Sequence, residues 1–336
     1  MSNAQPASHP DLEERFLEPA GWRWHHFERK PGRKVRFGSI FPKDSIPDAV
    51  VICLPGLSEF SEKYFETVRS LLDMNMAVWI MDWVGQGGSQ RYLKNPDKRH
   101  SAGFDEDVAD LHYFILEYIK HSSVHPDKGR IKMALLGHSM GAHIGLRYLQ
   151  EHPGMVECAG FTAPLAGITA VEAYPKPIAK LLLPLLALMG TSYAPGPYKD
   201  WTPQMRSAPT QDIFSSDPVR KNVHNAWCEF NRALATGHVT NKFLCAAVKS
   251  CDKLMAPGKL EKIETPCLIG VAGDEKIVSN TAIFNLSSRL PHVKILEMER
   301  AKHEILMETD DIREAFLDQF YALVQENIIG RPLNTF

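Results

Sequence analysis

The chain has 336 residues, of which 44% are hydrophobic, and this is enough to bury one large core. Its 38 basic and 40 acidic residues give a formal net charge of -2, a balance that argues against a nucleic-acid partner. The first residues lack the basic-then-apolar pattern of a signal peptide, and the longest apolar run, residues 181–189, is far shorter than the roughly 20 residues of a membrane-spanning helix. We therefore expect a soluble, cytoplasmic protein built from one large domain with an insertion.

The cysteines do not form a recognisable metal or disulfide pattern. There is no CxxC pair, and no histidine stands at zinc-finger spacing from a cysteine. We expect reduced and mostly buried thiols, as is usual for cysteines in cytoplasmic proteins. The six cysteines are Cys53, Cys158, Cys228, Cys245, Cys251 and Cys267.

Between residues 22 and 164 the sequence shows strand patterns that alternate with helical patterns. Residues 22–41 are rich in aromatic and basic residues and are broken by Pro31-Gly32, which predicts an antiparallel strand pair. Alternating strands and helices are typical of a parallel sheet that helices cover on both faces. The apolar runs predict strands at residues 49–54, 77–82, 131–136 and 156–164, and the helical patterns lie near residues 63–74, 105–119 and from 142 onward.

The alternation stops at residue 165 and resumes at about residue 260. Residues 165–259 show helical periodicity and many prolines but no strand pattern, and a stretch of this length is too long for a plain loop. We predict that it forms a helical cap, inserted between core segments 1–164 and 260–336. The second core segment has strand patterns at residues 266–273 and 293–298 and helical patterns at residues 281–290 and 310–327.

A Gly-His-Ser-Met-Gly sequence, residues 137–141, separates a predicted strand from a predicted helix. The G-x-S-x-G pattern at such a junction allows a sharp turn that presents the serine hydroxyl at the carboxyl end of a strand, where ligands collect in parallel sheets. A serine that only caps the helix would explain Ser139 but not the flanking glycines. We therefore interpret Ser139 as a nucleophile.

A serine nucleophile needs a histidine base and a carboxylate that orients the base. In folds with this turn the three residues follow in the order serine, acid, histidine. His292 precedes the strand at residues 293–298, whereas His303 follows it and so lies at the same sheet edge as Ser139. We expect His303 to be the base and a residue after the strand at 266–273 to be the acid. Spacing alone does not separate the adjacent Asp274 and Glu275.

Three motifs together resemble the α/β-hydrolase family, and within it the monoacylglycerol lipase and lysophospholipase group. They are PGLSEFSEKY at residues 55–64, DWVGQGGSQR at residues 82–91 and GHSMG at residues 137–141. The resemblance implies an α/β-hydrolase fold with a mostly parallel central sheet. Its register around the acid, Glu275-Lys276-Ile277-Val278, implies that Glu275 rather than Asp274 completes the triad.

The resemblance also implies that the backbone N–H groups of Leu57 and Met140 form the oxyanion hole. Pro55 stands where a histidine is usual in the family, so the loop lacks the side chain whose hydrogen bond steadies it there. The glycine-rich run at residues 85–88 is not a nucleotide-binding loop, because Gln90 replaces the required third glycine and no Walker lysine follows. We interpret this run as a tight structural turn.

These residues predict two-step acyl transfer, with no metal and no organic cofactor. The Leu- and Met-rich predicted cap favours a lysophospholipid, a monoacylglycerol or another long-acyl ester as substrate. Residues 176–190 could also rest on a membrane surface through Lys176 and Lys180. The alternatives are a small-ester esterase, a thioesterase, an acyltransferase, or a non-catalytic ligand-binding protein that has kept the fold.

Overall fold

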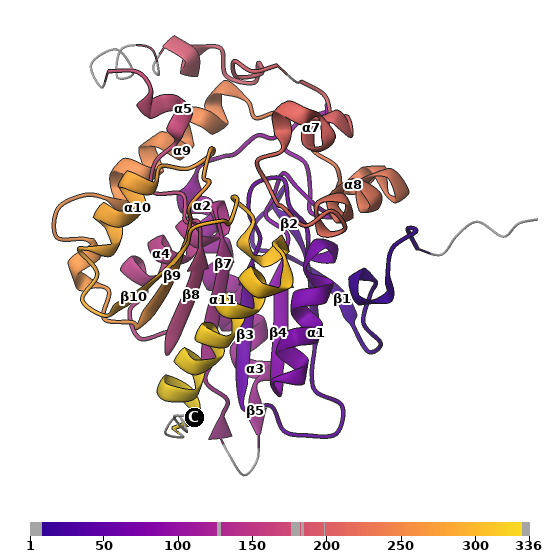
Figure 1. The fold of residues 1–336 in the computed structure, drawn as a ribbon, viewed down its shortest axis with the longest axis vertical. Helices are drawn as coiled ribbons and strands as arrows, with labels where there is room; N and C mark the ends of the chain where they lie inside the picture. The colour runs from indigo at the N-terminus through magenta and orange to yellow at the C-terminus, as the bar shows by residue number, and fades with distance from the viewer. Residues whose placement is uncertain (1–8, 126–128, 176–181, 183–184, 198, 331–336) are drawn as a thin grey trace, which may run out of the picture.

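The computed structural model describes residues 9–125, 129–175, 182, 185–197 and 199–330. Its centre is a sheet of eight strands in the order β1-β2-β4-β3-β7-β8-β9-β10 (Figure 1). The strands are β1 (Arg23–Glu28), β2 (Lys34–Ile40), β3 (Ala49–Leu54), β4 (Met76–Met81), β7 (Met133–His138), β8 (Cys158–Thr162), β9 (Cys267–Ala272) and β10 (Val293–Met298).

The sheet is mostly parallel. The six strands from β4 to β10 pair in parallel, whereas β2 pairs antiparallel with both β1 and β4. The predicted antiparallel pair and the parallel strands are thus confirmed. The predicted strand at residues 131–136 is displaced, because β7 pairs with β3 and β8 as far as His138, while the Ile131 N–H bonds to the Ser123 carbonyl.

Helices cover both faces of the sheet, and the side-chain alternation of the strands explains why both faces are apolar. Along β3, Val50 and Ile52 belong to one core cluster and Val51 and Cys53 to the other. One face carries α2 (Phe104–Phe114), α4 (Met140–Glu151) and α10 (Asn280–Ser287), and the other carries α1 (Phe65–Asp73) and α11 (Asp310–Val324) (Figure 1).

Short elements complete the core. The two-residue strands of the hairpin were not predicted, because they are too short to show a period. These elements are η1 (Glu14–Phe16), η2 (Ser61–Tyr64), η3 (Ile115–Ile119), α3 (Lys120–Ser122), the hairpin of β5 (Val124–His125) and β6 (Gly129–Arg130), η7 (Ile305–Met307) and η8 (Gln325–Ile329).

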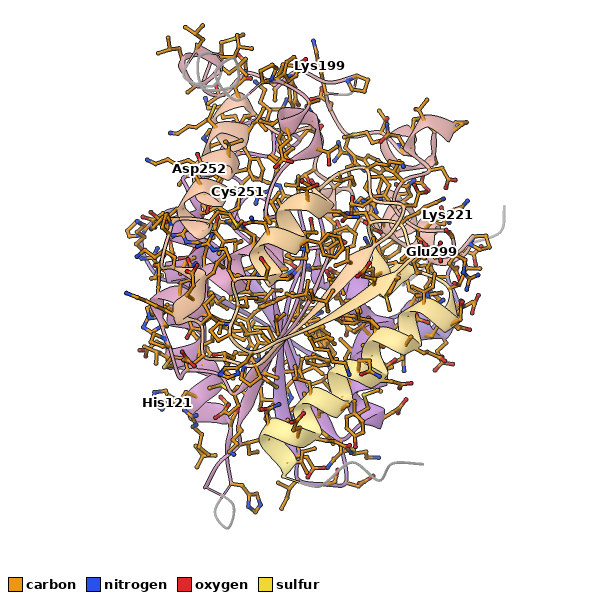
Figure 2. All side chains as sticks on the ribbon, turned by 60° about the vertical axis from the view of Figure 1, so that its left-hand side comes forward. His121, Lys199, Lys221, Cys251, Asp252 and Glu299 are labelled. Carbon is orange, nitrogen blue, oxygen red and sulfur yellow. The ribbon has the colours of Figure 1, made fainter. Side chains whose placement is uncertain are left out.

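Residues 163–266, the β8–β9 connection, contain helices and no named strand among those that the structure describes. Figure 2 shows Lys199 of the connection at the top of the molecule and His121 of the core far below. Because β8 and β9 are parallel, the end of the connection returns to the opposite edge of the sheet, where the Ala159 N–H bonds to the Pro266 carbonyl. Division of the chain into a core and a separate cap at residues 165–259 stays a prediction. The helices are α5 (Thr169–Glu172), α7 (Gln204–Ser207), η4 (Pro209–Gln211), α8 (Arg220–Phe230), η5 (Arg232–Leu234), α9 (Asn241–Leu254) and η6 (Leu260–Lys262).

Two chain-wide properties follow from the described residues. None of the six cysteines forms a disulfide, and all but Cys245 are buried. Within the described ranges, no helix has the length and apolar character needed to cross a membrane.

Candidate active site

Ser139 occupies the sharp turn between β7 and α4. Its φ is 50°, a left-handed value that is uncommon for a residue with a side chain. The turn requires glycines on both sides, since a Cβ at Gly141 would lie 2.0 Å from the Leu54 carbonyl oxygen and one at Gly137 would lie 2.9 Å from the Ala142 Cα. The G-x-S-x-G pattern is therefore explained by close backbone packing around a strained serine.

The structure brings Ser139, His303 and Glu275 into one chain of hydrogen bonds. His303 Nε2 lies 3.0 Å from Ser139 Oγ, and His303 Nδ1 lies 2.7 Å from Glu275 Oε2. All three side chains are almost fully buried. Because the carboxylate accepts the Nδ1 proton, Nε2 is the ring nitrogen that can accept a proton from Ser139.

Glu275, and not the adjacent Asp274, contacts the histidine. Glu275 Oε1 accepts the backbone N–H groups of Ile277 and Val278 at 2.7 and 3.2 Å. Burial alone would raise the pKa of Glu275, but the charge and hydrogen bond of His303 and these two N–H groups lower it below its ordinary value. The Asp274 side chain is 48% exposed and pairs with Lys276 at 2.7 Å. The Asp274 carboxylate therefore faces solvent and Lys276 rather than His303.

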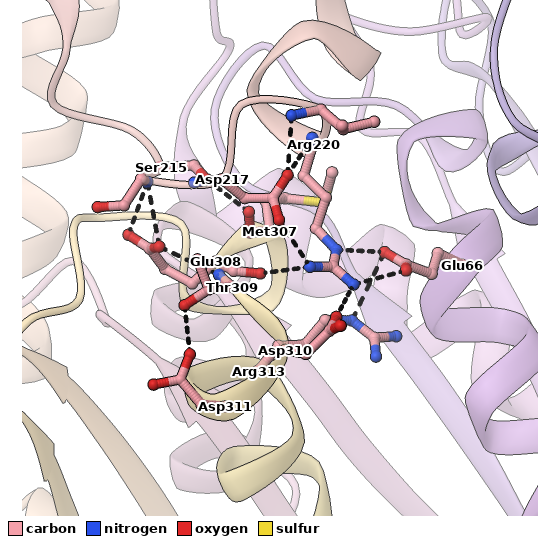
Figure 3. A network of polar contacts seen from close by, with 12 residues as sticks. Glu66, Ser215, Asp217, Arg220, Met307, Glu308, Thr309, Asp310, Asp311 and Arg313 are labelled. Carbon is pink, nitrogen blue, oxygen red and sulfur yellow. Dashed lines mark hydrogen bonds and ion pairs between the residues drawn. The ribbon is translucent and has the colours of Figure 1, made fainter.

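The loop that carries His303 is held by Glu308, which the sequence analysis missed. Glu308 is fully buried, and its carboxylate accepts the backbone N–H groups of Lys302 at 2.9 Å, Ser216 at 3.0 Å and Thr309 at 3.3 Å. Figure 3 shows this carboxylate between the β8–β9 connection and the start of α11. Glu308 therefore joins the residue before His303 to the connection.

The predicted oxyanion-hole residues both line the cavity above Ser139. Neither the Leu57 nor the Met140 backbone N–H donates a hydrogen bond to any acceptor in the described part of the chain. Uncommitted N–H donors in the wall of a cavity that also contains a serine hydroxyl are what the stabilisation of a tetrahedral oxyanion requires.

The loop bearing Leu57 is steadied by Gln86, although Pro55 cannot supply a side-chain hydrogen bond. Gln86 Nε2 donates to the carbonyls of Gly56 and Glu59, each at 2.7 Å, and Gln86 Oε1 accepts the Ser58 N–H at 3.1 Å. In turn, Arg99 Nε donates to Gln86 Oε1 at 2.9 Å. The side chain of Gln86, in the glycine-rich turn, thus holds the loop that carries Leu57 in place. In the sequence, only the resemblance to the D-x-x-G-x-G-x-S motif indicated that this segment matters.

A cluster of buried charges lies beside the site. The Lys63 ammonium contacts Glu59 Oε1 at 2.5 Å and Glu304 Oε1 at 2.7 Å, and Glu59 Oε2 accepts the Tyr64 hydroxyl. Burial opposes ionisation of Glu59, yet the charge of Lys63 lowers its pKa to about 2. Burial lowers the pKa of His138 to about 4, so this ring is neutral at pH 7.

The same cluster contains the only candidate metal site that the described residues form. Ligand atoms of Glu59, His138 and Glu304 lie within 4.8 Å of one another. However, the Lys63 ammonium already contacts both carboxylates, and His138 Nδ1 lies 3.0 Å from Thr162 Oγ1. A metal ion would have to displace the ammonium group, so the donor set suits a protein cation better.

Ser139 lies in the wall of a cavity of about 800 Å³ between the core and the β8–β9 connection. Most of its lining is apolar and comes from the connection, and its polar lining residues include Ser139 and His303. Such a cavity suits an elongated apolar ligand with one polar region. The apolar lining includes Leu165, Ile168, Leu182, Leu185, Leu186 and Met189.

Comparison with known proteins shows which family the chain is similar to. The model of the family described as "Serine aminopeptidase, S33" matches residues 45–310. Lysophospholipase L2 of Escherichia coli (strain K12) is 28% identical over 295 residues, which cover 85% of this chain and 82% of the bacterial protein. Monoglyceride lipase of Homo sapiens is 28% identical over 179 residues, 52% of each chain.

A solved structure supports the fold over almost the whole chain. The soluble variant of monoglyceride lipase from Saccharomyces cerevisiae, solved with a substrate analog, superposes with a TM-score of 0.66. The match covers 97% of this chain and 98% of the yeast chain at 16% sequence identity, so it shows a shared α/β-hydrolase fold.

Proposed function

The chain belongs to the family described as serine aminopeptidase, S33, and is a carboxylic ester hydrolase; we propose that it acts through an acyl-enzyme formed on Ser139. The observation that carries this proposal is the buried hydrogen-bond chain from Ser139 through His303 to Glu275. It supplies a nucleophile, a base and an orienting carboxylate in the required order.

In the proposed first step, His303 Nε2 takes the proton of Ser139 as Oγ attacks the ester carbonyl carbon. The N–H groups of Leu57 and Met140 stabilise the negative oxygen of the tetrahedral intermediate, and Glu275 stabilises the imidazolium. The C–O bond to the alcohol then breaks, and the alcohol leaves with the proton from His303. In the second step, His303 deprotonates water, which releases the acid and restores Ser139.

We infer that the substrate carries a single long acyl chain, as a lysophospholipid or a monoacylglycerol does. The cavity volume of about 800 Å³ and its apolar lining support a long chain over a small ester. The two names given to the sequence relatives, lysophospholipase and monoglyceride lipase, agree with this class.

The cavity chemistry favours an ester over the peptide that the family description suggests. An aminopeptidase needs an unpaired carboxylate to bind the free ammonium group of its substrate. The acidic residues among the described lining residues are Glu59 and Glu304, and Lys63 contacts both. Lys63, together with Arg206 at Glu304, thus already balances the charge of both carboxylates, although Glu304 Oε2 is buried without a hydrogen-bond partner.

We also propose that Leu182 and residues 185–189 contact a lipid surface from which the substrate enters. Leu182, Leu185, Leu188 and Met189 are 42%, 55%, 84% and 56% exposed, and three of them also line the cavity. Lys176 and Lys180 lie outside the described residues. Leu188, which does not line the cavity, offers a clean test: Leu188→Asp is expected to weaken binding to phospholipid vesicles, and unchanged binding would contradict the contact.

The acyl-enzyme is tested by covalent labelling with a fluorophosphonate together with turnover of a chromogenic ester. The proposal expects stoichiometric labelling of Ser139 and loss of both labelling and turnover in Ser139→Ala. A protein that labels but turns over no ester would favour a non-catalytic binding role. Transfer of the acyl group to an added alcohol or thiol in preference to water would favour an acyltransferase.

A further inference from the structure

Two arginines of the β8–β9 connection are buried, but they differ in how they are paired. The guanidinium of Arg220 has all three of its nitrogens bonded, as Figure 3 shows. This arginine is a structural clamp between the connection and the core. Its acceptors are the carboxylates of Glu66, Asp217 and Asp310 and the carbonyl of Glu308.

The Arg206 side chain is also largely enclosed, though less completely than that of Arg220, and it has few partners. Its side chain is 9% exposed, and Nη2 donates to Glu304. Among the described residues this is the sole hydrogen-bond acceptor of the guanidinium, which otherwise stacks on Phe214 at 3.9 Å, and Nε is buried without a partner. Because a guanidinium carries five N–H donors, most of the donors of this buried cation are uncommitted.

Arg206 lines the cavity that contains Ser139. It is the only lysine or arginine among the cavity-lining residues that the structure describes. Two other lining residues also have buried polar atoms without a partner, Trp201 Nε1 and Thr236 Oγ1. The described lining therefore has one cation and several uncommitted polar groups.

Arg206 and much of the apolar lining come from different sides of the connection. Arg206 belongs to α7 and His224 to α8, although Met205 and Phe214 also place apolar surface there. Val171 belongs to α5, Ile168 immediately precedes α5, and Leu182, Leu185 and Leu186 follow it. Figure 1 shows α5 on the opposite side of the molecule's upper end from α7 and α8. An amphiphile can thus place its acyl chain toward α5 and its polar group toward α7, with Ser139 in the same cavity.

The nearby carboxylates do not forbid an anion at this position. Glu59 is already bonded to Lys63, Tyr64 and the Gly56 N–H, and the Glu304 carboxylate is shared by Lys63 and Arg206. The charges of these two carboxylates are balanced by Lys63 and Arg206, although Glu304 Oε2 is buried without a hydrogen-bond partner. An incoming anion therefore meets no net negative charge from the four side chains and accepts from the remaining donors of Arg206. The planar guanidinium is the side chain that matches phosphate oxygens best.

We propose that Arg206 binds the phosphate of a lysophospholipid headgroup, so that the α7 side of the cavity selects single-chain phospholipids over uncharged monoacylglycerols. The inference rests on the proposed function, because it assumes that the ester of the same molecule reaches Ser139. It assigns Arg206 as a specificity-determining residue and identifies an anionic phosphodiester as the preferred polar group.

The kinetic test compares 1-palmitoyl-lysophosphatidylethanolamine with 1-palmitoylglycerol, which share one acyl chain, on the full-length protein. For Arg206→Met we expect the ratio of the two kcat/KM values to shift against the phospholipid by roughly ten- to a hundredfold. Arg206→Lys should recover part of the ratio. Asp212→Asn removes an ion pair between the same segment and Lys302 outside the cavity lining, and it should leave the ratio unchanged. An equal loss on both substrates in Arg206→Met would overturn the proposal.

A binding measurement separates this proposal from the catalytic one. In Ser139→Ala protein, Arg206→Met should weaken binding of the lysophospholipid by a similar factor and that of palmitoylglycerol much less. Glycerol 3-phosphate, which has no acyl chain, should compete weakly, and binding as tight as that of the lipid would point to a free phosphate ester and overturn the lipid assignment. If wild-type protein hydrolyses neither lipid, the proposed function fails, and the binding measurement still decides the role of Arg206.

Discussion

Gln86 donates a hydrogen bond from its side-chain amide to the carbonyl oxygen of Gly56 at 2.7 Å, across 30 residues of sequence. Gly56 precedes Leu57, whose N–H is one of the two proposed oxyanion donors. Pro55 has no side-chain donor or acceptor, and the glycine-rich turn after β4 compensates by presenting Gln86 to this loop. The glycine-rich turn, which we interpreted from the sequence as structural only, thus helps to position the uncommitted N–H group of Leu57.

Replacing Gln86 by alanine should lower kcat for an ester substrate by roughly 10- to 100-fold with a smaller change in KM. The reason is that the loop carrying Leu57 loses two donors to its carbonyls. Steady-state kinetics at pH 7 measures the effect. Gln90→Ala is the matched control, because Gln90 is exposed, follows the same turn, and bonds through its side chain to the Lys34 N–H rather than to the loop that carries Leu57. Equal kinetics in the two variants would show that Gln86 does not position the oxyanion loop.

Substitution of Glu275 should lower kcat strongly, whereas substitution of the adjacent Asp274 should change kcat little. Glu275→Gln is expected to lower kcat by about 10² to 10⁴-fold, because a carboxylate no longer stabilises the His303 imidazolium. Asp274→Asn removes only a solvent-exposed pair with Lys276 and should change kcat less than about twofold. Parallel measurement of kcat for both variants decides the matter, and a large loss confined to Asp274→Asn would assign the role to Asp274.

Glu308 is expected to act as a positioning residue for His303. In Glu308→Gln an amide group faces backbone N–H donors of Lys302, Ser216 or Thr309, so the loop should shift and kcat should fall about tenfold or more while KM changes little. Asp311→Asn provides the control, because Asp311 is 55% exposed and lies near the same helix start. A variant that loses thermal stability while kcat is retained would limit Glu308 to a structural role.

The pair of Glu59 and Lys63 should make stability depend on acid pH. The folded-state pKa of Glu59 is about 2, below its ordinary 4.5, so its contribution is fully present above pH 4.5 and is lost as the pH falls toward 2. Urea unfolding should show Glu59→Gln destabilised by about 3 kcal/mol at pH 7. The difference from wild type should shrink progressively below pH 4.5, and a difference that is constant from pH 7 to pH 3.5 would contradict the assignment.

Much of the core could be predicted because its signals are local. Apolar runs of strand length alternate with helical periods, and the G-x-S-x-G turn between a strand and a helix directed attention to Ser139. The order of elements then separated His303 from His292, since only His303 follows β10. Spacing could not separate Asp274 from Glu275, because two neighbouring loop residues differ only in where their side chains point.

The remaining features depend on contacts between distant parts of the chain. Arg220 and Glu66 are 154 residues apart, and Glu308 and Ser216 are 92 residues apart. No local sequence pattern predicts such pairs. A glutamate that will be buried also cannot be distinguished in the sequence from a glutamate on the surface. The start of β7 was also misjudged, because pairing with its neighbours rather than hydrophobicity sets where the strand begins and ends.

The most direct test of the central claim is hydrolysis of a p-nitrophenyl ester series from acetate to palmitate by wild type and Ser139→Ala. The proposed mechanism and the apolar cavity predict that kcat/KM rises with acyl length in wild type and falls to background in Ser139→Ala for every ester. Turnover of the long esters that persists in Ser139→Ala would contradict the assignment of the nucleophile. A wild-type preference for acetate would contradict the assignment of a long acyl chain.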